Sequence, residues 1–153
     1  MGDDDFARRV YCILGVPVDA IDMGGVVDRI HGAARSRRPL FLSTPNLNFL
    51  MLSQRDEAFR RSLLESDLCP ADGMGVLLIC RLLGVPIVAR VAGSDLPVAL
   101  QASRGLGSDG PLRVTLFGGA PGVGVLAREA LNAGNTNSLL CVGAVDPGAI
   151  ADP

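Results

Sequence analysis

The feature that most constrains the fold of this chain is a strand–turn–helix–strand pattern near its carboxyl end. Residues 112–117 (LRVTLF) indicate a strand, residues 118–124 a glycine-rich turn, and residues 125–133 a helix. Residues 139–145 (LLCVGAV) predict a second strand. Two strands joined through a helix by short corners form a right-handed parallel crossover. This part of the sequence therefore predicts parallel β-structure packed against a helix.

Short apolar runs alternate with helical patterns along the rest of the 153 residues as well. We expect a first strand and a turn over residues 10–16, where the apolar run ends in Gly-Val-Pro, and a buried strand over residues 40–44. Helices are expected from Asp19 or Asp22 to about Arg37, and over residues 45–52, 56–64, 75–83 and 96–103. This alternation predicts an α/β, Rossmann-like layered fold with a mostly parallel sheet flanked by helices. The length suits a single domain over residues 1–153.

Charge and aromatic content exclude several classes of function. Every one of the 14 basic residues is arginine, so a P-loop lysine, a Schiff-base lysine and a catalytic lysine are all excluded. The formal net charge of −2 gives no electrostatic reason to expect a nucleic-acid partner. Aromatic residues make up only 4% of the chain, which argues against stacking of bases or sugars on aromatic side chains. Arginine clusters within residues 35–38 and 55–61 are interpreted as solvated helix faces.

The cysteines and the single histidine do not form a recognisable metal site. Cys12, Cys69, Cys80 and Cys141 include no C-x-x-C pair, and His31 alone cannot complete a zinc site. Cys12 and Cys141 lie in apolar runs, so we expect both to be small buried residues with reduced thiols. The acidic amino terminus lacks the basic and apolar regions of a secretory signal peptide. These features predict a cytoplasmic protein.

The glycine-rich turn at residues 118–124 is the first candidate binding site. Glycine lets the backbone approach a ligand closely, and the amides at a helix amino terminus attract phosphate. Gly118, Gly119, Gly122 and Gly124 are therefore candidate nucleotide-binding residues. Their spacing does not match the G-x-G-x-x-G dinucleotide pattern. The turn is consistent with nucleotide binding and equally with a purely structural corner.

A second candidate site follows the strand expected at residues 40–44. In open α/β sheets, ligands bind beyond the carboxyl ends of the strands. Thr44, Asn46 and Asn48 carry hydroxyl and amide groups that can hydrogen-bond sugar hydroxyls or a uracil edge. The alternative is that Thr44 or Asn46 merely caps the next helix.

Asp72 and Arg90 stand at two further corners between apolar segments. The Asp72 carboxylate lies beside small and apolar residues, an environment that favours a general base. The Arg90 guanidinium has the fork geometry that suits a diphosphate. The alternatives are an Asp-Gly turn or a helix cap for Asp72, and a solvated surface side chain for Arg90.

The order and spacing of these motifs resemble a known family. The chain has T-P-N at 44–46, P-A-D-G at 70–73, R-V-A-G-S-D at 90–95 and L-F-G-G-A-P-G-V at 116–123. Together with the run FRRSLLESDLCPADGMGV, these blocks resemble the WecG/TagA/CpsF glycosyltransferases, which form glycosyltransferase family 26. The likeness covers nearly all of the chain, from about residue 10 to residue 150.

The resemblance implies an inverting glycosyltransferase with a Rossmann-like fold. Such an enzyme moves a hexose, of N-acetylmannosamine type or related, from a UDP-sugar to a polyprenyl-diphosphate-linked saccharide at the inner face of the bacterial plasma membrane. The products feed teichoic acid, enterobacterial common antigen or exopolysaccharide synthesis. The resemblance assigns Asp72 as the catalytic base, places Thr44, Asn46 and Arg90 in the substrate pocket, and sets the glycine turn near the nucleotide. The sequence has no D-x-D metal motif outside its acidic tail, so we expect no essential metal and no cofactor.

The chain departs from the family at its carboxyl end. The members it resembles continue with a G-x-P-x-Q-E-like motif and an arginine-rich segment that reaches the membrane. We therefore expect a C-terminally incomplete chain whose peripheral membrane contact requires the missing segment, and a homo-oligomer is one expected consequence of exposed apolar surface. Alternatives from other classes are a non-catalytic nucleotide- or sugar-binding α/β module, an inactive fragment of such an enzyme, and a small Rossmann-type oxidoreductase.

Overall fold

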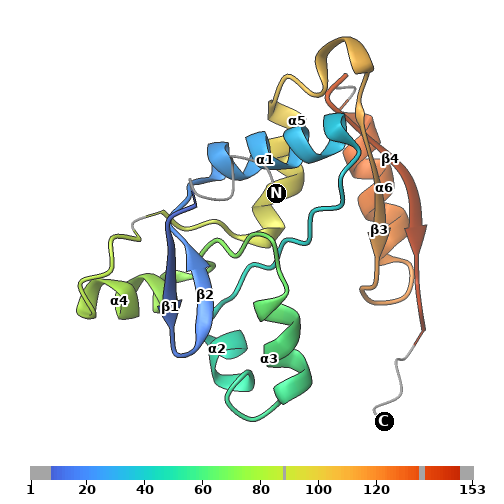
Figure 1. Ribbon diagram of the computed structural model, residues 1–153. Coiled ribbons are helices and arrows are strands. Elements are labelled where there is room, and N and C mark those ends of the chain that lie inside the picture. Colours follow the sequence, from blue (N-terminus) through green and yellow to red (C-terminus); the bar gives the residue numbers. More distant parts are fainter. Residues whose placement is uncertain (1–7, 88, 135–136, 149–153) are drawn as a thin grey trace. The chain divides into compact units, whose positions relative to one another are not determined.

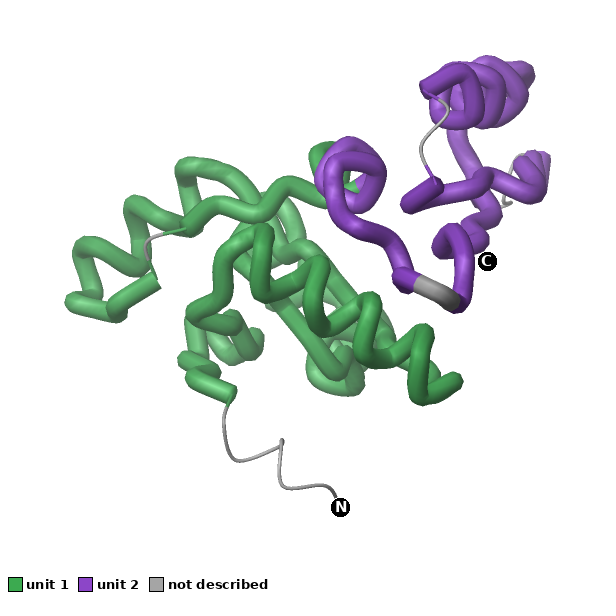
Figure 2. The backbone as a smooth tube through the Cα atoms, turned by 90° about the horizontal axis from the view of Figure 1, so that it is seen from above, with its two compact units in different colours: residues 1–96 green, residues 97–153 purple. Residues whose placement is uncertain are grey.

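A computed structural model of the chain describes residues 8–87, 89–134 and 137–148. The chain divides into two compact units, residues 1–96 and residues 97–153, which are coloured separately in Figure 2. Both units mix helices and strands (Figure 1). Each has its own two-stranded sheet, antiparallel in the first unit and parallel in the second.

The first unit opens with a β-hairpin. β1 (Val10–Ile13) and β2 (Val16–Asp19) pair antiparallel. The two residues between them, Leu14 and Gly15, have positive φ values of 50° and 79°. A type I′ hairpin turn requires positive φ at both of its central residues. The strand and turn predicted within residues 10–16 are therefore present, with the turn at Leu14 and Gly15, but the second strand that begins at Val16 was not predicted.

The hairpin also determines which cysteines are buried. Side chains alternate between the two faces of a strand, so Ile13 faces the core while its neighbour Cys12 is exposed. The prediction that Cys12 is buried is therefore wrong. Cys141 is 3% exposed, as predicted, and all four cysteines are free thiols.

The first helix begins at the second of its two candidate caps. α1 (Met23–Ser36) follows Asp22, whose carboxylate accepts a hydrogen bond from the Gly25 amide at 2.8 Å. An aspartate at this position satisfies one of the unpaired amides of the first turn. The helix ends where Arg37 takes a left-handed conformation with φ of 52°.

The other helices agree with the predicted ranges to within one or two residues. They are α2 (Leu47–Leu52), α3 (Glu57–Leu64), α4 (Met74–Leu82) and α5 (Leu96–Ala102). Two short 3-10 helices, η2 (Gly93–Asp95) and η3 (Gly107–Asp109), were not predicted. Asn46 and Asp56 cap α2 and α3 through hydrogen bonds from the Phe49 and Phe59 amides. These two phenylalanine rings pack edge to face, with centroids 5.1 Å apart.

Extended segments beside β2 supply the parallel contacts of the first unit. Asp19 bridges to Pro70, and Leu42 bridges to Leu68, both in parallel orientation. Prolines at 39, 45 and 70 lack the N–H donor that a longer ladder needs. The strand predicted over residues 40–44 is accordingly reduced to a single bridge. The chain is α/β, but its described residues form one antiparallel and one parallel two-stranded sheet instead of a mostly parallel layered sheet.

The core of the first unit anchors the loops that follow these segments. Its main cluster consists of buried residues from the hairpin, from α2 to α4 and from their connections: Ile13, Val16, Val18, Leu50, Leu63, Ala71, Val76, Cys80 and Ile87. A second cluster joins Val26, Leu68 and Val91. Because Ala71 and Val91 belong to these clusters, the backbone beside Asp72 and Arg90 is fixed by burial.

The second unit contains the predicted parallel crossover. β3 (Leu112–Phe117) leads through the glycine turn into α6 (Val123–Ala133), and β4 (Leu139–Val145) pairs parallel with β3. The Asn132 side chain on α6 donates to the Cys141 carbonyl and accepts from the Cys141 amide, both at 2.9 Å. The helix begins two residues earlier than predicted, and both strand predictions are confirmed.

Candidate functional site

Three loops of the first unit meet at the carboxyl ends of its extended segments. The Asp72 amide donates a hydrogen bond to the Pro45 carbonyl at 3.0 Å, and the Val91 amide donates to the Ala71 carbonyl at 2.8 Å. Pro45, Ala71 and Val91 are all fully buried. The fold therefore brings together three of the four motifs that the sequence singles out.

Asp72 lies on the central loop of the three. It is half-buried and precedes α4, whose cap is Gly73 with φ of 85° and no capping side chain. The structure therefore does not support the alternative that Asp72 is a helix cap. Within the described ranges, no group donates a hydrogen bond to the Asp72 carboxylate. A carboxylate in this state can accept a proton from a ligand hydroxyl.

The polar side chains of the loop at residues 44–48 differ in whether they already form a hydrogen bond within the protein. The Asn46 side-chain oxygen accepts from the Phe49 amide at 3.0 Å, so the capping alternative is right for this residue. Thr44 is half-buried, and its hydroxyl forms no hydrogen bond with a described residue. Asn48 is exposed on the first turn of α2. Thr44 and Asn48 therefore keep polar groups available to a ligand.

Arg90 is exposed on the third loop and is held by an ion pair. Its Nη2 donates to Asp95 Oδ2 at 3.0 Å, while the Ser94 hydroxyl donates to Asp95 Oδ1 at 3.3 Å. The side chains of Arg90 and Asp95 are 47% and 52% exposed. Only one of the five guanidinium N–H donors takes part in this bond, which leaves the others available to an anion.

The glycine turn belongs to the second unit and stands apart from these loops in the sequence. Gly118, Gly119 and Gly122 have φ values of 87°, 94° and 81°, which residues with a side chain rarely adopt. Gly124 has a different role, because an added Cβ would lie 3.2 Å from the Ala144 side chain. It allows α6 to pack closely on β4.

The same turn borders a cavity of about 40 Å³. A cavity of this size admits water molecules. Asp146, the acidic residue that follows β4, also lines the cavity and brings negative charge to it. Backbone conformation or close packing gives each of the four glycines a structural reason. Nucleotide binding at this turn stays a prediction.

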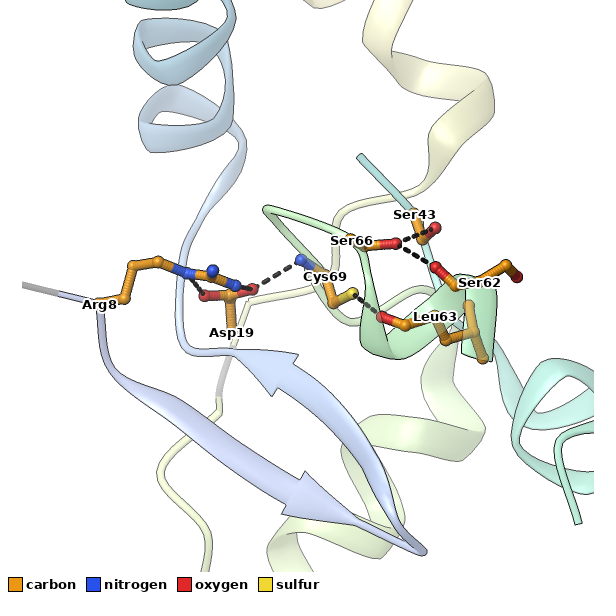
Figure 3. A network of polar contacts seen from close by, with 7 residues as sticks. All are labelled: Arg8, Asp19, Ser43, Ser62, Leu63, Ser66 and Cys69. Atoms are coloured by element: carbon orange, nitrogen blue, oxygen red, sulfur yellow. Dashed lines mark hydrogen bonds and ion pairs between the residues drawn. The ribbon is translucent and has the colours of Figure 1, made fainter. Parts of the chain in front are cut away.

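A polar network of Arg8, Asp19 and Cys69 lies next to the segment that leads into the central loop, and Figure 3 shows its side chains. Arg8 Nε and Nη2 donate to the two Asp19 carboxylate oxygens at 2.9 and 2.8 Å, and the Cys69 amide donates to Asp19 Oδ2 at 2.6 Å. Asp19 is 3% exposed. The hydrogen bond to Asp19 raises the pKa of Arg8, and burial raises the pKa of the Cys69 thiol. The network ties β2 to the segment that ends in Asp72.

Sequence reasoning missed this network. It treated Asp19 only as one of two candidate helix caps, and it assigned Arg8 no role. Eleven positions separate the two residues, and no local period links them. The available signal was an aspartate at the end of an otherwise apolar strand, a place where a buried carboxylate needs a cation.

Comparison with known proteins places the chain in a family. A sequence model described as the glycosyl transferase WecG/TagA/CpsF family matches residues 11–150. The chain belongs to the WecG/TagA/CpsF glycosyltransferase family. A comparison with curated proteins returned no match.

The WecG/TagA/CpsF match extends over both compact units and includes all four sequence motifs. It supports a function in glycosyl transfer for cell-surface polysaccharide synthesis. Within the described ranges, no three His, Cys, Asp or Glu side chains gather into a possible metal site. None of the helices in those ranges is long and apolar enough to cross a bilayer.

Proposed function

We propose that this WecG/TagA/CpsF protein is an inverting hexosyltransferase that uses a UDP-sugar donor. The acceptor is a polyprenyl-diphosphate-linked saccharide, and the product serves bacterial teichoic acid or exopolysaccharide synthesis. The observation that carries the proposal is the Asp72 carboxylate. It accepts no hydrogen bond from the described residues and lies on the central of three hydrogen-bonded loops.

Asp72 acts as the general base in this reaction. Inversion in a single displacement requires removal of a proton from the acceptor hydroxyl as its oxygen attacks the anomeric carbon. The bond from that carbon to the UDP oxygen breaks as the new glycosidic bond forms. The proton passes to the Asp72 carboxylate, and UDP leaves with the bonding electron pair.

The neighbouring polar groups bind the donor. Arg90 offers N–H donors to the diphosphate, whose negative charge grows as UDP departs. The Thr44 hydroxyl and the amides of Asn46 and Asn48 bind the sugar or the uracil. In the second unit, the backbone amides of the turn at residues 118–124 are a separate candidate site for a nucleotide.

With the carboxyl-terminal segment that the family resemblance implies, the proposed enzyme works in the cytoplasm, peripheral to the inner face of the plasma membrane. The UDP-sugar is water-soluble, whereas the acceptor is anchored in lipid by its polyprenyl chain, so chemistry takes place at the membrane surface.

The Asp72→Asn variant gives the direct test. It keeps the size of the side chain and removes the base, so in a version that carries the carboxyl-terminal segment of the family, transfer to a lipid-linked acceptor should fall by about 100-fold or more. UDP-sugar binding, measured by calorimetry, should be unchanged. Asp28→Asn makes the same charge change at an exposed position on α1 and should leave transfer at the original rate.

Other outcomes select the alternatives. An unchanged transfer rate in Asp72→Asn would remove Asp72 from the role of base. UDP-sugar binding without any transfer, even in the version that carries the carboxyl-terminal segment, would support a non-catalytic binding module. Binding of a nicotinamide dinucleotide in preference to UDP would support the oxidoreductase interpretation.

A further inference from the structure

Residues 93–95 lie against two of the proposed binding groups at once. This segment is the short helix η2, and the buried residues Val91 and Ala92 hold the backbone that precedes it. Gly93 lies against Thr44, and Asp95 pairs with Arg90. Neither residue has a part in the reaction as proposed above.

Gly93 leaves room for the Thr44 side chain. A Cβ added at Gly93 would lie 2.8 Å from Thr44 Oγ1 and 3.6 Å from its Cγ2. The first distance is shorter than real Cβ contacts, so Thr44 would have to move. The backbone of Gly93 does not lie in the left-handed region, so its conformation does not require glycine. Space beside the Thr44 hydroxyl is therefore the structural reason for a glycine at this position.

Asp95 holds the Arg90 side chain in one orientation. Its Oδ2 accepts from Arg90 Nη2, and its Oδ1 accepts from the Ser94 hydroxyl. Both partners of the ion pair are about half exposed, and exposed pairs contribute little to folding stability. A flexible arginine loses side-chain freedom when it binds an anion, and an arginine that is already held loses less. The pair therefore contributes little to the stability of the fold, and it can lower the entropy that Arg90 loses on binding an anion.

We propose that Gly93 and Asp95 are positioning residues of the donor site. Gly93 preserves the place of the Thr44 hydroxyl, and Asp95 preorganises the Arg90 guanidinium for a nucleoside diphosphate. The inference rests on the proposed function, in which Thr44 and Arg90 bind the UDP-sugar.

Two variants of Asp95 separate positioning from charge. Asp95→Ala removes the hydrogen bond and the negative charge, whereas Asp95→Asn removes the charge and keeps an oxygen acceptor. If Asp95 positions Arg90, UDP binding weakens in Asp95→Ala by about 2- to 12-fold, which corresponds to ordering one flexible side chain. Asp95→Asn then binds UDP at least as tightly as the original chain. If Asp95 acts only by repelling the diphosphate, both variants bind UDP more tightly, and that outcome overturns the proposal.

A double-mutant cycle tests Gly93. Gly93→Ala should weaken UDP binding, but it should have no further effect in a Thr44→Ala background, where the added methyl group meets no hydroxyl. Gly32→Ala is the matched control, because a Cβ at Gly32 on α1 would meet no atom within 4 Å. Equal losses from Gly93→Ala with and without the Thr44 hydroxyl would overturn the role of Gly93.

A third measurement distinguishes failure of this inference from failure of the proposed function. The nuclear magnetic resonance signal of the Arg90 Nε–H group reports side-chain order without any ligand. It should show increased mobility in Asp95→Ala and native order in Asp95→Asn. Unchanged order in Asp95→Ala overturns the positioning role. Absence of UDP binding by the original chain, or unchanged UDP binding in Arg90→Ala, counts instead against the proposed function.

Discussion

At the scale of single residues, burial separates the four thiols of the chain into two groups. Cys12 is exposed on β1, whereas Cys69, Cys80 and Cys141 are buried. Alkylating reagents attack the accessible thiolate. The buried thiols can react only after the surrounding structure opens.

We therefore expect iodoacetamide to modify Cys12 first under native conditions. Peptide mass mapping over a time course should show Cys12 labelled while the other three thiols remain intact. In urea, all four should react at similar rates. Early labelling of Cys69 in the native protein would contradict its burial behind the Asp19 network.

Residue by residue, the positions of the candidate site residues in the fold were predictable where a polar side chain follows an apolar segment. Asp72 and Arg90 follow apolar segments, and polar side chains at such corners are the expected ligand groups of α/β proteins. The relation between Thr44 and Gly93 was not predictable, because it depends on atoms 49 positions apart that only the tertiary fold brings together. The capping role of Asn46 was predictable as an alternative, since an asparagine before a helix favours it.

At the scale of elements, helix ends were predicted best because local capping chemistry marks them. Asp22 and Asp56 bond to amides three residues ahead, a distance that the sequence itself displays. The second strand of the hairpin, Val16–Asp19, was missed because the tight turn needs positive φ at Leu14, which leucine rarely adopts. The strand expected at residues 40–44 was wrong because it pairs with Leu68 at a single bridge only, and the pairing segments lie far apart in the sequence.

Two leucines, one on α2 and one on α4, differ strongly in burial. Leu50 on α2 is 0% exposed, whereas Leu82 at the end of α4 is 78% exposed. Leu50→Ala should lower the free energy of unfolding by about 2–5 kcal/mol, because it leaves a cavity in the core. Leu82→Ala should change the free energy of unfolding by no more than about 0.5 kcal/mol.

Urea titrations of the two variants measure this difference directly. A large loss of stability in Leu82→Ala would show that the exposed side of α4 is covered in solution, for example by a second copy of the chain. Gel filtration of the same variant would then detect the change of assembly.

At the scale of the whole molecule, we expect the buried thiols to lower the free energy of unfolding at alkaline pH. Burial raises the pKa of Cys69 and of Cys80 above the ordinary value. Above about pH 8.5 the unfolded chain loses these thiol protons while the folded chain keeps them. The unfolded state then binds fewer protons, so the free energy of unfolding decreases as pH rises.

The expected slope reaches about 1.4 kcal/mol per pH unit for each thiol that ionises only on unfolding. Below about pH 8 this contribution should be constant. Urea unfolding at a series of pH values measures the slope, and Cys69→Ala should make it shallower. The same slope in Cys69→Ala and in the original chain would assign the effect to other groups.

The Arg8–Asp19 pair has a practical consequence for anyone who trims the gene. The family match begins at residue 11, so a clone cut to the matched range would discard Arg8 and retain Asp19. A carboxylate that is 4% exposed would then lose its only described cation, at a cost of about 2–4 kcal/mol once the partial exposure of Arg8 is allowed for. We expect such a clone to give a lower soluble yield and a lower melting temperature than one that begins at Met1, and an added Asp19→Asn substitution to recover part of the loss. The sequence boundary of the family and the physical boundary of the folded unit therefore differ by at least three residues.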